Sequence, residues 1–214
     1  MLGQIIINNK GSLDDFNFII ENINIGNPNP NIITATVPYM NGYYDFSEIT
    51  GELTYSSREI IVIFKYKEYE AFSSNLNSIY LKFINWLYES GEIKISWIKG
   101  YFEGRVTSIS ELSLLEDERV IEVTFLCQPF RILKEEKVEL NIENSLALSL
   151  LNSGTRKTYL SVLANSDMKI ISGSKEYSLE ANKKTKILKL DVGTNNITIQ
   201  GTGEINLTWK EMAI

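Results

Sequence analysis

The side chains of this chain that could do chemistry are mostly carboxylates, and they occur in three groups. Asp14 and Asp15 are adjacent, Asp45 lies three residues before Glu48, and residues 116–118 read Glu-Asp-Glu. Two carboxylates about 5 to 10 Å apart can hydrolyse a glycosidic bond, so a hydrolase is one interpretation of these groups. The triple acid lies in a predicted turn, where a solvated surface is the simpler interpretation.

Histidine is absent from the 214 residues, and Cys127 is the single cysteine. Without histidine there is no Ser-His-Asp or Cys-His nucleophile pair, and no histidine-ligated zinc, copper or haem. One cysteine cannot form an intramolecular disulfide or a CxxC metal knuckle. The calcium-loop, GxGxxG and GxxxxGK[ST] patterns are also absent. We therefore expect no catalytic residue, no metal and no cofactor, and we interpret Cys127 as a buried structural thiol.

Strand patterns dominate the elements that must position these side chains. Residues 60–64 form a β-branched run, and residues 93–98 alternate between polar and apolar. Residues 106–114 and 120–127 flank the triple acid and predict an antiparallel pair. The Asn41-Gly42 dipeptide predicts a tight hairpin turn, because it supplies positive φ angles at little steric cost.

One segment has helical rather than strand periodicity. From Phe72 to Leu87 the apolar residues recur at steps of three, four and one, which mark one face of an amphipathic helix. The pattern predicts a helix over about residues 72–88. The apolar stripe is interpreted as a core face, not as a groove for a partner.

The C-terminal part predicts a second, all-β domain. From about residue 138, seven or so short strands follow at close spacing and suggest a small β-sandwich. Residues 172–174 and 201–203 predict hairpin turns in it. Trp86, Trp97 and Trp209 could stack on sugar rings, but their positions in predicted helix or strands favour core packing.

Charge divides the chain in a similar way. Residues 1–131 carry a net charge of -7 and residues 132–214 a net charge of +1, within the total of -6. An acidic first part argues against a sequence-reading nucleic-acid binder, which needs a basic face. No apolar run reaches the roughly 18 residues that span a bilayer, and we see no signal peptide. We expect domains at residues 1–133 and 138–214.

Several motifs resemble those of the phage distal tail protein family, in the same order along the chain. Residues 37–47 (VPYMNGYYDFS) resemble its P-x-x-N/D-G-x-Y-D-x-S signature, and residues 55–64 its Y-x-x-R-x-I/L strand. The predicted helix is followed by residues 101–106 (YFEGRV), which are similar to its Y-x-G-R-V strand. Residues 125–130 (FLCQPF) resemble the F-x-C-x-P-F end of its N-terminal domain.

The C-terminal part fits the same family. Residues 152–156 (NSGTR) resemble an N-x-G-T/N start, and residues 201–205 (GTGEI) resemble a G-x-G-x-I hairpin near the end. The family's acidic D-D/E-P segment is replaced here by residues 96–100, which contain no proline. The resemblance covers nearly the whole chain.

The resemblance implies a mechanical function at the tail tip of long-tailed phages. Such proteins form homohexameric rings through the N-terminal domain and join the major tail tube protein to the baseplate hub or tail-associated lysin. The C-terminal domain is galectin-like and often docks receptor-binding proteins. DNA would pass only through the ring lumen, and no membrane is involved. From the net charge of -7 on residues 1–131 we also hypothesise that acidic lumen walls repel the DNA phosphates. The expected location is the virion, after synthesis in the host cytoplasm.

We interpret the predicted hairpin as the ring-building element, with Asn41, Gly42, Tyr43, Tyr44 and Asp45 as its interface residues. An ordinary hairpin with no interface role is the alternative. Two other functions stay open at this point. The C-terminal sandwich could be a carbohydrate-binding module for host adhesion, or the chain could be the hub of a related contractile tail or tail-like bacteriocin.

Overall fold

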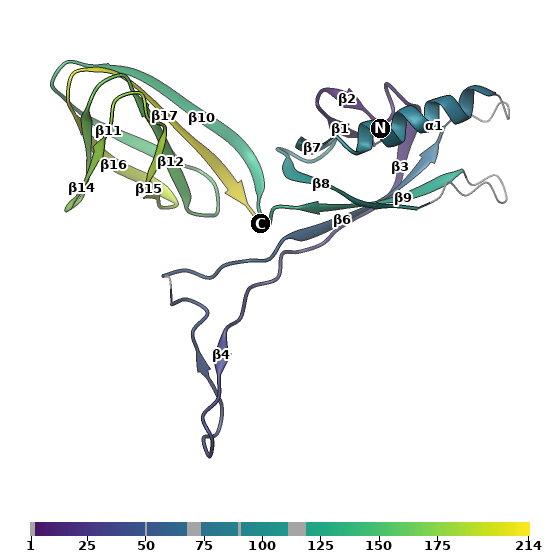
Figure 1. The fold of residues 1–214 in the computed structure, drawn as a ribbon, viewed down its shortest axis with the longest axis horizontal. Coiled ribbons are helices and arrows are strands. Elements are labelled where there is room, and N and C mark those ends of the chain that lie inside the picture. The colour runs from purple at the N-terminus through teal and green to yellow at the C-terminus, as the bar shows by residue number, and fades with distance from the viewer. Residues whose placement is uncertain (1–2, 50, 68–73, 90, 111–118) are drawn as a thin grey trace. The chain divides into compact units, whose positions relative to one another are not determined.

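The computed structural model describes residues 3–49, 51–67, 74–89, 91–110 and 119–214. The chain divides into two compact units, Met1–Arg131 and Ile132–Ile214, and each has its own hydrophobic core. Both units consist mainly of β-strands, and a helix lies in the N-terminal unit (Figure 1). The predicted mainly-β fold with a helix in its first half is confirmed. No helix in the described part of the chain is long and apolar enough to cross a membrane.

A seven-stranded sheet with the order β2-β1-β7-β8-β9-β6-β3 forms the centre of the N-terminal unit. Its strands are β1 (Ile5–Ile7), β2 (Lys10–Gly11), β3 (Phe18–Ile25), β6 (Arg58–Tyr66), β7 (Gly91–Ile95), β8 (Phe102–Ile109) and β9 (Val120–Cys127). Every second residue of a strand faces the same side of the sheet, so Ile60, Val62 and Phe64 of β6 all enter the core. The acidic turn predicted at residues 116–118 lies outside the described residues.

Helix α1 (Ser74–Leu87) lies across one face of this sheet (Figure 1). Phe83 and Leu87 are fully buried, and the Phe83 ring stacks on Phe18 with 4.1 Å between the ring centroids. The indole N–H of Trp86 donates to the Ile7 carbonyl at 3.2 Å, which ties the helix to β1. The apolar stripe is therefore a core face, as predicted. Residues 72 and 73, at the start of the predicted span, lie outside the described residues.

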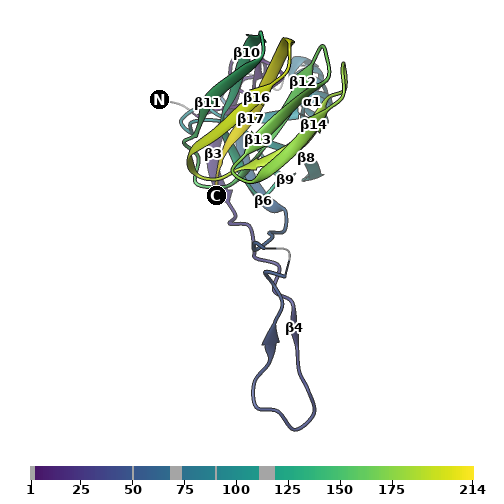
Figure 2. The same ribbon diagram turned by 90° about the vertical axis from the view of Figure 1, so that its left-hand side faces the viewer.

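Between β3 and β6 the chain leaves the sheet as a long hairpin, which we call the arm (residues 26–57; Figures 1 and 2). It contains the short antiparallel pair β4 (Thr34–Ala35) and β5 (Tyr44–Asp45). Near the sheet, Pro30 forms a β-bridge with Tyr55. The arm is therefore held by contacts between its own two sides.

The prediction of a tight turn at Asn41-Gly42 is wrong. The loop that joins β4 to β5 covers residues 36–43, so the dipeptide is only part of a longer connection. The hydrogen-bonded turn comes earlier, where Met40 N–H donates to the Val37 carbonyl at 3.1 Å. Pro38, the second residue of that turn, starts it. Gly42 has φ of 92° and lies later in the loop, where the chain turns back toward β5.

The C-terminal unit is a sandwich of two four-stranded sheets, with the orders β10-β17-β12-β15 and β11-β16-β13-β14 (Figure 2). Its strands are β10 (Arg131–Ile142), β11 (Ser145–Asn152), β12 (Thr158–Ala164), β13 (Met168–Ser172), β14 (Lys175–Leu179), β15 (Thr185–Leu190), β16 (Gly193–Gln200) and β17 (Gly203–Ala213). Alternating residues of both sheets, such as Leu160, Ile170 and Leu207, are fully buried between them.

Of the two hairpins predicted in this unit, one is confirmed and one is wrong. β13 and β14 pair antiparallel around Gly173, whose φ of 58° suits a tight turn. β16 and β17 do not pair with each other, because they belong to different sheets. The segment between them crosses from one sheet to the other. Gly201 N–H donates to the Asn144 carbonyl at 2.9 Å, which fixes this crossing beside the one from β10 to β11.

The three tryptophans differ in burial. Trp86 and Trp209 are buried, as predicted. Trp97 is 54% exposed, so the prediction of core packing is wrong for this residue. β7 ends at Ile95, two residues earlier, so Trp97 lies in the following turn with its ring against the backbone of Gly3.

Candidate assembly interface

The arm carries large apolar side chains that its own chain does not cover. Eight of them are 41% to 108% exposed: Ile32, Ile33, Val37, Tyr39, Tyr43, Tyr44, Phe46 and Ile49. A contiguous group of exposed apolar residues of this kind marks a protein–protein contact. The arm is therefore the candidate interface of the N-terminal unit.

Asp45 and Ser47 hold the two sides of the arm together. Ile33 N–H donates to Ser47 Oγ at 2.8 Å, and Phe46 N–H donates to the Ile33 carbonyl at 2.8 Å. Ser47 N–H donates to the Asp45 carboxylate at 2.8 Å, and hydrogen bonds from the Ser47 hydroxyl and N–H lower the pKa of Asp45. The D-x-S part of the signature thus has a structural role, because it fixes the backbone of the arm.

The tip of the arm holds a tyrosine in an unusual conformation. Tyr39 follows Pro38 and has φ of 66°, which a type II turn requires of its third residue and which L-residues rarely adopt. The Tyr39 side chain is fully exposed. The turn therefore presents an aromatic ring to solvent at the end of the arm.

The predicted interface residues all lie on the arm, but they are not alike. Asn41, Gly42, Tyr43 and Tyr44 are exposed, while the Asp45 carboxylate is bound within the arm. Sequence reasoning missed the rest of the exposed apolar group, including Ile32 and Ile49 on either side of the signature. The feature that could have pointed to them is the apolar-rich stretch at residues 32–49. It lies between a proline-rich loop and β6, and it has neither strand nor helix periodicity.

Three of the matched motifs meet where the arm joins the sheet. We call this group the arm-root cluster: Tyr55, Arg58, Phe102, Gly104, Cys127, Pro129, Phe130. Tyr55 packs edge-on against Phe130 at 5.4 Å, and Arg58 Nε donates to the Pro129 carbonyl at 2.8 Å. Cys127 stands opposite Arg58 on one side and opposite Gly104 on the other.

Gly104 is required by this packing. A Cβ at this position would lie 2.6 Å from Cys127 Sγ and 2.7 Å from the Leu126 carbonyl oxygen, and real Cβ atoms essentially never come so close. Burial raises the pKa of the Cys127 thiol to about 12, and the nearby Arg58 charge lowers it only in part. The thiol is therefore neutral and buried at physiological pH, as the sequence predicted.

Two of the carboxylates that suggested a hydrolase, Asp14 and Asp15, accept structural hydrogen bonds. Gln4 Nε2 donates to Asp14 Oδ2 at 2.7 Å, and Gly11 N–H donates to Asp15 Oδ2 at 2.7 Å. In the described ranges, no group of three or more acidic or cysteine side chains is placed to hold a metal ion. The geometry of these residues therefore gives the hydrolase interpretation no support.

The C-terminal unit has a shallow groove of about 360 Å³ on its β11-β16-β13-β14 sheet. The polar residues Ser149, Asn196 and Thr198 line it, and Ser149 Oγ donates to Asn196 Oδ1 at 2.7 Å. Its lining includes no aromatic ring. The exposed Tyr159 belongs to the other sheet, where Lys189 lies 5.3 Å above its ring.

The sequence matches no protein-family model and no curated protein. Among solved structures, the chain is similar to the Dit protein (gp 19.1) of SPP1, with a TM-score of 0.70 and 12% identity over 100% of both chains. That protein is presented as a paradigm of the hub adsorption apparatus in phages that infect Gram-positive bacteria. A chain of the phage P2 baseplate in its activated conformation with Ca matches with a TM-score of 0.48 and 6% identity, over 97% of this chain and 98% of that chain. A chain of the same baseplate with Sr matches with a TM-score of 0.45 and 6% identity, over 97% of each chain.

The chain therefore has the fold of the SPP1 Dit protein along its whole length. The resemblance that the motifs predicted is thus confirmed at the level of the fold.

Proposed function

We propose that this protein is a non-enzymatic structural protein of a phage tail tip, where it acts as a hub adaptor. The observation that carries the proposal is the match with SPP1 Dit over the whole of both chains. Such a protein works by interlocking surfaces, which agrees with a chain that has no histidine and whose adjacent Asp14 and Asp15 accept structural hydrogen bonds. It would be made in the host cytoplasm and located in the virion.

The N-terminal domain, residues 1–133, forms a homohexameric ring in this proposal. Supporting it, the arm exposes eight large apolar side chains that a neighbouring copy would cover. A contact between the arm of one copy and a different surface of the next is heterologous, and such contacts generate closed rings when the rotation closes. Tyr43 and Tyr44 are the interface residues we propose first, because aromatic side chains dominate protein contacts.

The ring joins the major tail tube protein on one side to the baseplate hub or tail-associated lysin on the other. The C-terminal domain, residues 138–214, is a galectin-like sandwich that docks receptor-binding proteins and so contributes to host attachment. DNA passes through the ring lumen without being captured, in agreement with the net charge of -7 on residues 1–131.

The mass of the assembled protein in solution tests the ring. Sedimentation and native mass spectrometry of the full chain are expected to give six times the chain mass of 24.4 kDa. A Tyr43→Ser/Tyr44→Ser variant, which changes only exposed residues, is expected to stay folded by circular dichroism and to lose the assembled species. A chain that remains monomeric at high concentration, alone and with its tail tube partner, would contradict the ring.

Carbohydrate binding by the C-terminal sandwich is the weaker candidate. Sugar sites usually combine a groove with an aromatic ring, but here the groove with Ser149 and Asn196 and the exposed Tyr159 lie on different sheets. A glycan array probed with the full chain tests this directly. Specific binding that is lost on Asn196→Ala substitution would favour an adhesion module over a docking platform. A hub of a tail-like bacteriocin would share the proposed ring.

A further inference from the structure

The Asn41-Gly42 dipeptide lies in the loop of the arm and takes no part in the hydrogen bonds that hold the arm together. Both residues are exposed. Within the described residues, neither the Asn41 side-chain amide nor the Gly42 N–H has a hydrogen-bond partner. A Cβ placed on Gly42 would have no heavy atom within 4 Å beyond its chain neighbours. The dipeptide is therefore accessible to water and has open space around it.

An asparagine followed by a glycine can react with its own backbone. The backbone nitrogen of Gly42 attacks Asn41 Cγ, the new N–Cγ bond closes a succinimide ring, and the Cγ–Nδ2 bond breaks. The proton of the Gly42 nitrogen leaves with the amide group as ammonia. Water then adds to either ring carbonyl and opens the ring, which gives aspartate or isoaspartate. Glycine suits the second position, because it has no side chain to obstruct the attack and its backbone rotates freely.

Two other asparagines that precede a small residue are held in place by hydrogen bonds. Asn152, before a serine, is buried, and its amide donates to the carbonyls of Arg156 and Asp191. Asn165, also before a serine, is exposed, but its Oδ1 accepts from Glu204 N–H at 2.8 Å. These bonds must break before the backbone can reach the side chain. At Asn41 no such bond has to break, so Asn41 is expected to react faster than both.

We propose that Asn41-Gly42 is a modification site, at which the unassembled chain deamidates and thereby loses its ability to join the ring. The modification does not depend on the proposed ring, but its consequence rests on it. The loop at residues 36–43 carries no charged side chain. The whole arm has three carboxylates, Asp45, Glu48 and Glu52, and no lysine or arginine. A new carboxylate at position 41 therefore has no opposite charge on the arm to neutralise it.

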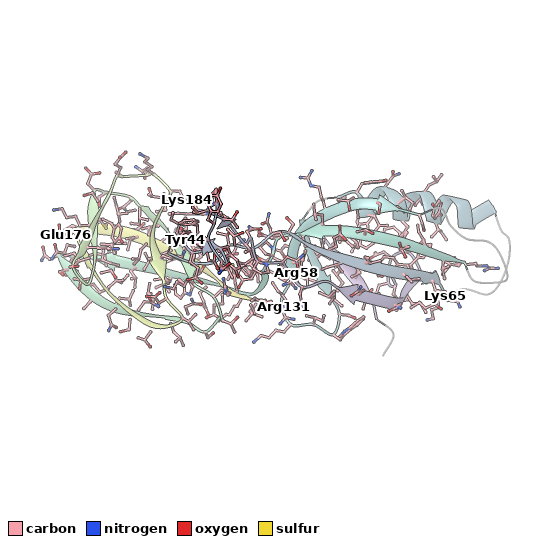
Figure 3. All side chains as sticks on the ribbon, turned by 90° about the horizontal axis from the view of Figure 1, so that it is seen from below. Tyr44, Arg58, Lys65, Arg131, Glu176 and Lys184 are labelled. Atoms are coloured by element: carbon pink, nitrogen blue, oxygen red, sulfur yellow. The ribbon has the colours of Figure 1, made fainter. Side chains whose placement is uncertain are left out.

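The new charge would appear among the side chains proposed to contact a neighbouring copy. Tyr43 and Tyr44 follow position 41 closely in the chain, and Figure 3 labels Tyr44 on the arm. Moving an unpaired charge from water into an apolar contact is costly, and residues 1–131 already carry a net charge of -7. Isoaspartate also adds a methylene to the backbone of the loop. Conversely, a neighbour that covers the loop excludes water and fixes its backbone, so assembly protects Asn41.

Peptide mapping by mass spectrometry tests the modification. The full chain is incubated in warm, mildly alkaline buffer, and aspartate and isoaspartate are quantified at each asparagine over time. Conversion at Asn41 is expected to be faster than at Asn165 and at least about tenfold faster than at Asn152, whose amide must first break two hydrogen bonds. Asn41→Gln keeps the amide but closes the ring far less readily, so it should show no conversion. Equal rates at Asn41 and Asn152 would overturn the site.

Sedimentation of the full chain over a range of concentrations tests the consequence. Asn41→Asp is expected to weaken assembly at least about tenfold, while its circular dichroism spectrum stays that of the wild type. Aged wild type should lose assembly in proportion to its converted fraction, whereas aged Asn41→Gln should keep it. An Asn41→Asp chain that assembles as well as Asn41→Gln overturns the link to assembly and leaves the ring standing. A wild type that never assembles overturns the ring and this link together, and the peptide map still decides the modification.

Discussion

At the scale of single residues, the matched motifs turn out to hold backbone together. Asn152, in the N-x-G-T segment, is fully buried, and its amide donates to the carbonyls of Arg156 at 2.9 Å and Asp191 at 3.2 Å. Its Oδ1 accepts from Gly154 N–H at 3.2 Å. One side chain thus joins the loop at residues 154–156 to the backbone at Asp191.

Replacing Asn152 should therefore destabilise the C-terminal unit. Asn152→Ala leaves two carbonyls and one N–H without partners, and we expect a loss of about 2–4 kcal/mol in the free energy of unfolding. Asn152→Asp should cost at least as much, because the carboxylate cannot donate to the two carbonyls. Urea denaturation measures both. Asn141→Ala, at an exposed position of β10, is the control and should change stability by less than about 0.5 kcal/mol.

Cys127 should make stability fall at high pH. Its folded pKa, about 12, is raised above the ordinary value of 9.0, so stability is fully present below pH 9.0. Above that pH the unfolded thiol ionises while the folded thiol stays neutral, and stability falls by up to about 1.4 kcal/mol per pH unit until the folded pKa is reached. Urea denaturation should show that the wild type loses stability relative to Cys127→Ala between about pH 9 and 11. Equal slopes for the two proteins would contradict the assignment.

At the scale of elements, α1 stabilises the N-terminal unit by packing its buried face against the sheet. Phe83 contacts four aromatic residues, Phe16, Phe18, Phe64 and Trp86, with ring centroids between 4.1 and 5.7 Å away. These partners come from the loop before β3, from β3, from β6 and from the helix itself. The ring of Phe83 thus fills the space between the helix and the sheet.

The two faces of α1 should respond differently to substitution. Phe83→Ala removes a fully buried ring, and we expect a loss of about 3–5 kcal/mol, since the cavity can collapse only in part. Leu81→Ala, two residues earlier, changes a side chain that is 54% exposed and should cost less than about 1 kcal/mol. Both values come from urea denaturation at a concentration where the chain is monomeric. Similar losses for the two variants would mean that the helix does not pack as described.

At the scale of the whole molecule, the chain has two separate cores. Phe64 and Phe125 belong to the core of the N-terminal unit, and Leu160 and Ile199 belong to that of the C-terminal unit. A unit with its own core can unfold on its own. The arm adds little to either core, because its apolar side chains face solvent.

Calorimetry of the full chain should therefore show two unfolding transitions. Phe83→Ala is expected to lower only the transition of the N-terminal unit, and Asn152→Ala only that of the C-terminal unit. A fragment of residues 132–214 should reproduce the second transition alone. A single transition that both variants shift together would show that the two cores unfold as one.

The elements that local pattern determines could be predicted from the sequence. The helical stripe around Phe83, the β6 run and the hairpin around Gly173 are local, because they depend on side-chain period and on the φ angles of a few neighbouring residues. The segment at residues 201–203 does not form the predicted hairpin. Two strands joined by a glycine-rich turn have the same sequence pattern whether they pair with each other or lie in different sheets. Trp97 was misread because the end of β7 depends on pairing with β1 and β8.

The sequence by itself determined the strand-rich composition, the acidic first part, the absence of histidine chemistry and the order of the family-like motifs. Only the tertiary structure decided what those motifs do: Asp45 and Ser47 fix the arm, while Arg58, Gly104 and Cys127 meet at its root although they are up to 69 residues apart. The physical reason is that hydrophobic burial and unpaired charge depend on what surrounds a side chain in space. Local period predicts which residues share a face, but it does not show that the apolar side chains of the arm are left exposed or that Gly104 lies against the Cys127 thiol.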